Sequence, residues 1–218
     1  MVANPETPSP VLLAPQSNLA SAVSLAISLG HGCAMTGPLG KISCWGSNYS
    51  GQLGRAEPGY FEFARQIPEI VGATQLTVGG QHSCSLVGGV VKCWGSNWSG
   101  QLGVPGEDTP IPQPVNDLSD VVEMRAYANT SCVRLGGGTV KCWGSNTGGI
   151  LGDGSGIEWS ATPVVVSNIQ RATAIGMSAS ISCAIEEGGV WCWGENWNGA
   201  LGDGTTQQRS TPVQVILP

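Results

Sequence analysis

Eight cysteines are the residues of this sequence whose spacing points most clearly to chemistry. They fall into four short-range pairs with none left over: Cys33 with Cys44, Cys84 with Cys93, Cys132 with Cys142, and Cys183 with Cys192. Zinc sites favour a Cys-x-x-Cys spacing, which none of these pairs has. Pairing of all eight would also exclude a cysteine nucleophile. Because such pairs are typical of oxidising compartments, the pattern predicts four disulfides in an extracellular or periplasmic protein.

The histidines and carboxylates offer little catalytic chemistry. His31 and His82 occupy one position of a repeat, so we expect buried hydrogen-bonding roles, and no Ser/His/Asp set can be assembled from them. Asp153 and Asp203 lie in Leu-Gly-Asp-Gly turns, where a calcium loop or a glycosidase carboxylate pair is conceivable. The other two repeats have no acid at this position, which favours a plain turn. We therefore expect no catalytic residue, no metal and no cofactor.

Aromatic residues are the better functional signal. Three of them follow the asparagine of a polar, glycine-rich turn, and four lie in variable loops. Aromatic side chains exposed on a rigid scaffold form protein-binding hot spots or sugar platforms. Packing between repeats is the competing explanation. The residues of this candidate rim are Tyr49, Trp98, Trp197, Tyr60, Phe61, Phe63 and Trp159.

All of these residues belong to a repeat of about fifty residues. Each copy has a cysteine, a glycine-containing turn, the triplet Cys-Trp-Gly and then Asn-x-x-Gly-x-Leu-Gly. A fixed period of this length indicates a propeller, a solenoid or an array. The tryptophans of the triplet are expected in the core: Trp45, Trp94, Trp143 and Trp193.

Each repeat contains the signals of four strands. The alternation of apolar residues over 23–29 has the period of a strand. Gly88-Gly89 lies between two β-prone runs and predicts a hairpin that places Cys84 opposite Cys93. Four strands in about fifty residues are what a propeller blade requires. We predict an all-β, β-propeller-type domain of four blades with one hairpin disulfide each, after an irregular segment 1–9, with units at 10–66, 67–111, 112–161 and 162–218.

Composition narrows the choice of partners. The formal net charge is −6 and only 11% of the 218 residues are charged. Nucleic acids and anionic membranes attract clustered Lys and Arg, and the sequence has no basic run, so we expect neither partner. No run of about twenty apolar residues is present, so membrane insertion is not expected. A signal peptide is not visible in residues 1–10, and we expect it to have been removed.

The repeat resembles the regulator of chromosome condensation repeat family, whose blades carry a similar Trp-Gly-x-Asn and Gly-Gln-Leu-Gly sequence. Gly80-Gln81-His82-Ser83 matches the family's histidine position, whereas Thr130 and Ile181 depart from it. The resemblance implies a β-propeller. The paired cysteines differ from the eukaryotic nuclear members and are similar to a secreted bacterial form. Because members usually close seven blades, four repeats leave three outcomes: a four-bladed ring, two chains in an eight-bladed ring, or an open array.

These observations together predict a non-enzymatic extracellular module for protein interaction or self-assembly. The partner is then another protein or a second copy of the chain, joined through terminal strands. The alternative is an inhibitor of a secreted or periplasmic enzyme, similar to a propeller inhibitor of β-lactamases in this family. Guanine-nucleotide exchange, known for the founding member, and carbohydrate binding are less favoured. Asn48, Asn97 and Asn129 match the glycosylation pattern, and whether they are used stays open.

Overall fold

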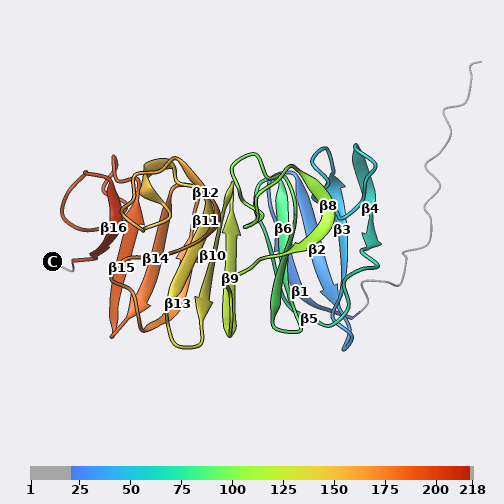
Figure 1. Cartoon of the computed structure of the whole chain (residues 1–218), viewed down its shortest axis with the longest axis horizontal. Coiled ribbons are helices and arrows are strands. Elements are labelled where there is room, and N and C mark those ends of the chain that lie inside the picture. Colours follow the sequence, from blue (N-terminus) through green and yellow to red (C-terminus); the bar gives the residue numbers. More distant parts are fainter. Residues whose placement is uncertain (1–20, 217–218) are drawn as a thin grey trace, which may run out of the picture.

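The computed structural model describes residues 21–216, which are almost entirely β-structure (Figure 1). They form four antiparallel sheets of four strands each. The helical content of this range is one short 3₁₀ turn, η2 (Thr147–Gly149), so no helix in it is long enough to cross a bilayer. The predicted all-β architecture of four blades is confirmed.

The sheets follow one another along the chain, and in each the consecutive strands are neighbours. Their bounds are as follows: β1 (Ala22–Ile27), β2 (His31–Thr36), β3 (Lys41–Ser47) and β4 (Tyr60–Gln66) in blade 1; β5 (Ala73–Val78), β6 (His82–Val87), β7 (Val90–Gly95) and β8 (Thr109–Pro114) in blade 2; β9 (Val121–Tyr127), β10 (Thr130–Leu135), β11 (Val140–Ser145) and β12 (Trp159–Val165) in blade 3; β13 (Ala172–Met177), β14 (Ile181–Glu186), β15 (Gly189–Gly194) and β16 (Arg209–Gln214) in blade 4.

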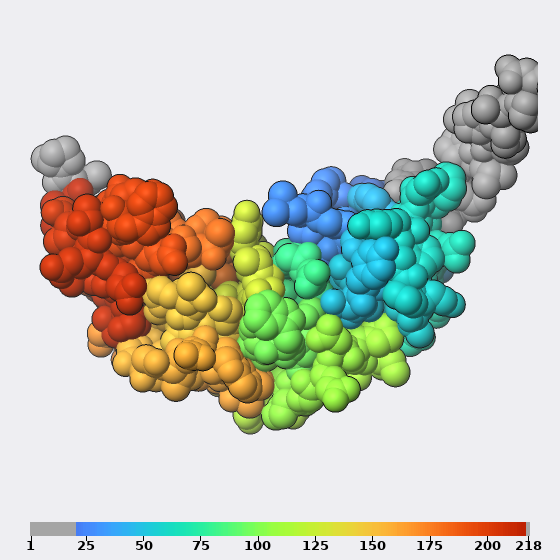
Figure 2. Space-filling view, turned by 90° about the horizontal axis from the view of Figure 1, so that it is seen from above, coloured from blue at the N-terminus to red at the C-terminus, as the bar shows by residue number. Residues whose placement is uncertain are grey.

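The four blades are arranged side by side in an arc. The first strands β1, β5, β9 and β13 contact one another in turn, and the fourth strand of each blade lies at the other side of its sheet. Figure 2 shows that this arc is open on one side, with blade 1 at one end and blade 4 at the other. The described residues therefore do not close a ring. The expected start of the first unit, near residue 10, lies outside the described residues.

One disulfide braces the central hairpin of each blade. Cys33 is directly opposite Cys44 in the register of β2 and β3, with their Cα atoms 4.1 Å apart. The other blades repeat this pairing: Cys84 is bonded to Cys93, Cys132 to Cys142, and Cys183 to Cys192. No cysteine of the described residues is left free, and the four predicted pairs are confirmed. Each bond closes a loop of about ten residues, which stabilises the fold by roughly 2–3 kcal/mol in the chain-entropy model.

Glycine follows each tryptophan of the triplet because the strand turns sharply there. Gly95 has a φ of 110°, in the region that favours glycine. A Cβ atom on Gly95 would lie 2.5 Å from the carbonyl oxygen of Gln81 on the neighbouring segment. The register between β7 and β8 also shifts between Cys93 and Gly95. After this irregularity Gly95 still pairs with Thr109, and the chain then enters the long loop before β8.

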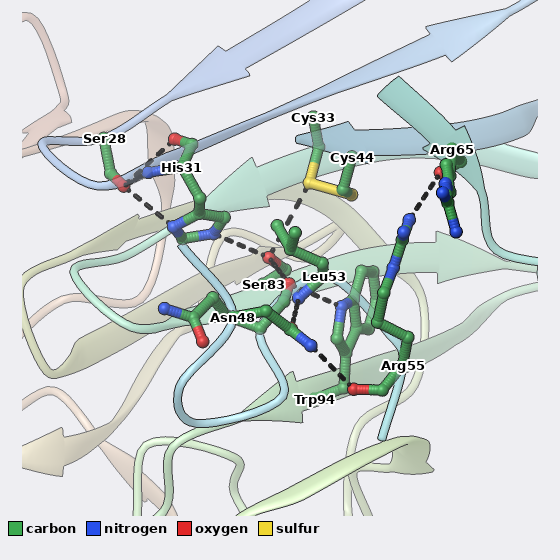
Figure 3. Close-up of a disulfide and its surroundings, with 11 residues drawn as sticks. Ser28, His31, Cys33, Cys44, Asn48, Leu53, Arg55, Arg65, Ser83 and Trp94 are labelled. Atoms are coloured by element: carbon green, nitrogen blue, oxygen red, sulfur yellow. Dashed lines mark hydrogen bonds between the residues drawn. A yellow bond between two sulfur atoms is a disulfide. The ribbon is translucent and has the colours of Figure 1, made fainter. Parts of the chain in front are cut away.

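Neighbouring blades are joined by a repeated set of hydrogen bonds, here called the inter-blade joint. Trp94 of blade 2 donates its indole N–H to the carbonyl oxygen of Gln52 in blade 1, at 2.9 Å. Ser83 donates its hydroxyl to the same oxygen, also at 2.9 Å (Figure 3). The same joint recurs twice, from Trp143 and Ser131 to Gln101 and from Trp193 and Ser182 to Ile150.

Apolar packing surrounds each inter-blade joint. Trp94 belongs to a core cluster made mainly of blade 1 residues, such as Ile42, Leu53 and Ile67. Trp143 and Trp193 extend into the clusters of blades 2 and 3 in the same way. The core of this protein therefore lies between the blades as well as within them.

Trp45 differs from its three counterparts. Trp94, Trp143 and Trp193 are at most 1% exposed, whereas Trp45 is only partly buried. The expectation that all four tryptophans are core residues is wrong for Trp45. The reason is that each of the others packs against the preceding blade, and the described residues place no blade before blade 1.

The inter-blade joint predicts unequal effects of one substitution at two equivalent positions. Trp94→Phe removes a buried hydrogen bond and leaves a cavity, and should lower the free energy of unfolding by about 2 kcal/mol. Trp45→Phe, at the partly exposed site, should lower it by less than about 0.5 kcal/mol. Urea unfolding of dilute protein, followed by circular dichroism, measures both. Equal losses would show that the joint does not contribute to stability.

Candidate functional site

The loops between the third and fourth strands all emerge at one edge of the arc, here called the loop edge (Figure 1). The asparagine that follows each Trp-Gly pair organises its loop. Asn97 donates its side-chain amide to the carbonyls of Val104 and Gly106, both at 2.9 Å, and accepts a hydrogen bond from the Leu102 amide at 3.0 Å. Asn48, Asn146 and Asn196 act in the same way, and Figure 3 shows Asn48 in this role.

Five large aromatic side chains project from the loop edge. They are between 52% and 75% exposed. Three directly follow the asparagines that organise the loops, here called the clamping asparagines. The other two are the first residue of a fourth strand. They are Tyr49, Trp98, Trp197, Tyr60 and Trp159. The exposure of these five residues argues against inter-blade packing as the reason for their presence.

Some of these aromatics are grouped in space. The rings of Tyr49 and Tyr60 meet edge to face, with centroids 5.2 Å apart. Trp98 of blade 2 and Trp159 of blade 3 both line two adjoining hollows at the boundary between these blades, of about 520 and 650 Å³. Trp197, at the far end of the arc, has no aromatic ring stacked on it among the described residues.

The hollows beside Trp98 and Trp159 carry negative charge. Glu107 and Asp108 line one, and Glu158 lines the other. Asp108 also accepts the backbone N–H of Asn97 at 2.6 Å, which orients its carboxylate against the loop. The sequence does not single out Glu158 as a site residue. Its position immediately before Trp159, at the start of a fourth strand, is the signal that could have found it.

Phe61 and Phe63, the other two residues of the predicted rim, line a separate hollow of about 220 Å³ on blade 1 together with Tyr60. Phe61 is partly buried, packs on the core of blade 1 and lies beneath the guanidinium groups of Arg55 and Arg65. The inclusion of Phe61 in an exposed rim is therefore wrong. Phe63 is exposed, but it is three residues further along β4 than Tyr60 and so away from the loop edge.

The histidines belong to the inter-blade joint. His31 lies between Ser28 and Ser83, with its Nδ1 3.0 Å and its Nε2 2.9 Å from their hydroxyl oxygens (Figure 3). Because Ser83 donates its proton to Gln52, Nε2 of His31 must be the protonated nitrogen. His82 repeats the contact with Ser131 at 2.8 Å. Burial lowers the pKa of His31 to about 4 and that of His82 to about 3, so both are neutral at pH 7.

The carboxylates of the Asp-Gly turns have structural partners. Asp203 accepts hydrogen bonds from Thr205 and Asn196 and pairs with Arg209 at 2.8 Å. The Thr205 hydroxyl, followed by Arg209, lowers the pKa of Asp203 to about 2. Asp153 accepts the backbone N–H of Ser155. Within residues 21–216, no three His, Cys, Asp or Glu side chains gather as metal ligands would.

Comparisons with known proteins agree with this architecture. The model of the regulator of chromosome condensation (RCC1) repeat matches residues 187–218. Prp20p from Saccharomyces cerevisiae superposes with a TM-score of 0.79 at 18% identity, over 90% of this chain and 50% of that one. The chain has the fold of the RCC1-repeat β-propellers.

Two further structures share features of this RCC1-type fold. Human WBSCR16 superposes with a TM-score of 0.78 at 22% identity, over 90% of this chain and 53% of that one. The ectodomain of the Physcomitrella patens receptor kinase CR4 gives 0.52 at 18% identity, over 79% and 39%. The chain thus spans about half the length of Prp20p and WBSCR16. No curated protein sequence matches it.

The two buried histidines predict that stability falls as the solution is acidified. Each has a lower pKa in the folded state than its ordinary value of about 6.5, so the unfolded chain binds protons first. The stability is complete above pH 6.5 and is lost as pH falls towards about 4 for His31 and about 3 for His82. The slope should reach about 1.4 kcal/mol per pH unit for each histidine. Urea midpoints measured between pH 7 and 4.5 test this.

His31→Gln is the matched variant, because glutamine keeps a hydrogen-bond donor but does not titrate. The slope in this variant should be about half that of the wild type. Asp203 contributes only below about pH 4, outside the measured range, because its pKa is lowered. An unchanged slope in His31→Gln would show that other groups cause the acid sensitivity.

Proposed function

We propose that this RCC1-type chain is a non-enzymatic protein-interaction module that works outside the reducing cytosol and binds its partner at the loop edge. The observation that carries the proposal is the set of five exposed aromatic side chains there. Tyrosine and tryptophan dominate the energetics of protein interfaces because they bury a large area at a small cost in conformational entropy. The four disulfides support the oxidising compartment.

The loops that present these aromatics are preorganised. Asn48, Asn97 and Asn196 fasten the turns that carry Tyr49, Trp98 and Trp197 through hydrogen bonds to backbone groups on both sides of the loop. A loop that is already ordered loses little entropy when a partner binds. The ordered turns therefore support the proposal that these aromatic residues form a recognition surface.

The charge of the loop edge favours a basic partner. Glu107, Asp108 and Glu158 line the hollows between Trp98 and Trp159, and the chain has a net charge of −6. A lysine or arginine side chain can stack on tryptophan through a cation–π contact and pair with a nearby carboxylate. We therefore expect the partner to insert basic side chains at this boundary between blades 2 and 3.

Similar propellers support protein binding as a general use of the fold. The structure of Prp20p was described together with its binding to Gsp1p and histones, and yeast RCC1 (Prp20) has been crystallised bound to Kap60. An inhibitor of a secreted or periplasmic enzyme would be one form of such a binding module. Nucleotide exchange and carbohydrate binding are not favoured by any contact in the described residues.

Self-association is the second candidate function. The observation that favours it concerns the two ends of the arc, where apolar side chains that are buried at internal blade boundaries are exposed. This surface is separate from the loop edge, so the two activities are independent in principle.

Peptides selected on the wild-type chain from a phage-displayed random library test the loop edge. They should be enriched in Lys and Arg, and calorimetry should show that Trp98→Ala combined with Trp159→Ala weakens their binding at least about 10-fold. The matched control is Leu39→Ala, which removes an exposed apolar side chain from the opposite edge and should leave affinity unchanged.

The proposal fails if the selected peptides bind the double variant as tightly as the wild type. Selection of sugars from a glycan array, with no enriched peptide, would instead indicate a lectin. Circular dichroism of both variants establishes that any loss of binding is not a loss of fold.

A further inference from the structure

We propose that the two ends of the arc are complementary halves of the inter-blade joint, so that blade 4 of one copy docks on blade 1 of a second copy. This inference rests on the self-association proposed above and names the surface and its contacts. It concerns the flat faces of the end blades and not the edges of terminal strands.

The face of blade 1 that points away from blade 2 is apolar and exposed. Leu25 and Ile27 on β1 are 60% and 66% exposed. The residues that pair in the same register on the other first strands are covered by the preceding blade. Val78, Met124 and Ile175 are at most 6% exposed, and Leu76, Ala126 and Met177 are partly buried. Leu25 and Ile27 therefore form one half of a blade boundary, here called the entry half. Residues 21–216 contain no preceding blade that supplies the other half.

The entry half also contains a hydrogen-bond donor that has no acceptor among the described residues. Trp94, Trp143 and Trp193 each donate the indole N–H to a carbonyl of the preceding blade. No described residue accepts a hydrogen bond from the equivalent nitrogen of Trp45, whose side chain is only partly buried. Among residues 21–216, the indole N–H of Trp45 is therefore a donor without a partner, and it belongs to the same blade as the exposed strand β1.

The outward face of blade 4 shows the complementary exposure. Val190 on β15 is 41% exposed, whereas the residues at its position in the other blades, Ile42, Val91 and Val140, are at most 1% exposed. Those three are covered by the following blade.

Two neighbours of Val190 repeat the contrast. Ile185 is 43% exposed, whereas its counterparts in blades 1 and 2, Met35 and Leu86, are at most 8% exposed; the counterpart in blade 3 is Arg134. Val215 is partly buried, and its counterpart Ile67 is 1% exposed. Blade 4 therefore presents the other half of such a boundary, here called the exit half.

The exit half contains a carbonyl oxygen that could accept this hydrogen bond. Gln52, Gln101 and Ile150, whose carbonyls accept the indole N–H groups, are at most 2% exposed. Ala200 occupies their position in blade 4 and is exposed, and no described residue donates to its carbonyl oxygen. Trp45 of one copy and Ala200 of another would complete a fourth inter-blade joint.

Neither half contains its partner of the histidine–serine contact: the exit half lacks the histidine and the entry half lacks the serine. At the first two boundaries a histidine of one blade meets a serine of the next. At the proposed boundary the exit half has Ile181 in place of the histidine, and the entry half has Gly32 in place of the serine. Docking would thus bury no unpaired hydroxyl or imidazole at this point, which would otherwise be costly.

An interface between two different faces of the same chain is heterologous, so it produces a ring if the rotation closes and a longer head-to-tail assembly if it does not. Figure 2 shows blade 1 and blade 4 at opposite ends of the open arc, so the two halves of the proposed boundary lie at different ends of one chain. Both kinds of assembly contain the same boundary.

Two variants that each block one face test the proposal. Leu25→Asp with Ile27→Asp blocks the entry half, and Ile185→Asp with Val190→Asp blocks the exit half. Sedimentation of the full 218-residue wild-type chain should show concentration-dependent association. Each blocked variant should be monomeric, with the association constant lowered at least about 100-fold. Leu39→Asp, exposed on a hairpin outside both faces, is the matched control and should associate like the wild type.

Mixing the two blocked variants distinguishes a head-to-tail boundary from a symmetric one. Each variant keeps one intact face, so the mixture should form a 1:1 dimer and nothing larger. A monomeric wild type, a blocked variant that still associates with itself, or a mixture that stays monomeric would each overturn the proposal. Peptide binding at the loop edge should be unchanged in both blocked variants, so the failure of one proposal does not imply the failure of the other.

Discussion

At each boundary between blades, one buried carbonyl oxygen accepts the indole N–H of a tryptophan and the hydroxyl of a serine from the next blade, and an apolar cluster surrounds this contact. The disulfides cannot replace this contact, because all four lie within a blade. A unit of about fifty residues with many glycines buries too little apolar surface by itself. The blades are therefore stiff individually, and the arc exists because each blade completes the core of its neighbour.

The same boundaries contain the two buried histidines. His31 and His82 are held neutral by burial, and each connects its blade to a serine of the next. Both ring nitrogens of His31 have a serine partner, whereas His82 has one only at Nε2 and its buried Nδ1 has no hydrogen-bond partner among the described residues. Thr130 and Ile181 replace the histidine in the last two blades. The histidine contact therefore reinforces only the first two boundaries, whereas the tryptophan and serine contacts to the shared carbonyl occur at all three.

The loop edge and the end faces expose different kinds of apolar side chain. At the loop edge, aromatics are exposed on turns that the clamping asparagines already order, as expected of a recognition surface. At the end faces, the exposed residues are aliphatic and lie on regular strands, as expected of an interior boundary that has been cut open. The two kinds of surface support the two separate proposals, a basic protein segment at the loop edge and a second copy of the chain at the end faces.

The sequence by itself determined the repeat, the all-β class and the pairing of the cysteines, because these follow from local spacing: two β-prone runs around a glycine turn place Cys84 against Cys93, and the same spacing places Cys132 against Cys142 and Cys183 against Cys192. It also pointed to Tyr49, Trp98 and Trp197, since an aromatic in a polar turn has little to pack on. Only the tertiary structure decided that Phe61 is partly buried against the core beneath two guanidinium groups, that Trp45 is only partly buried, and that Glu158 and Trp159 line the same hollow. Those outcomes depend on which blade lies next to which, and a period of fifty residues does not contain that information.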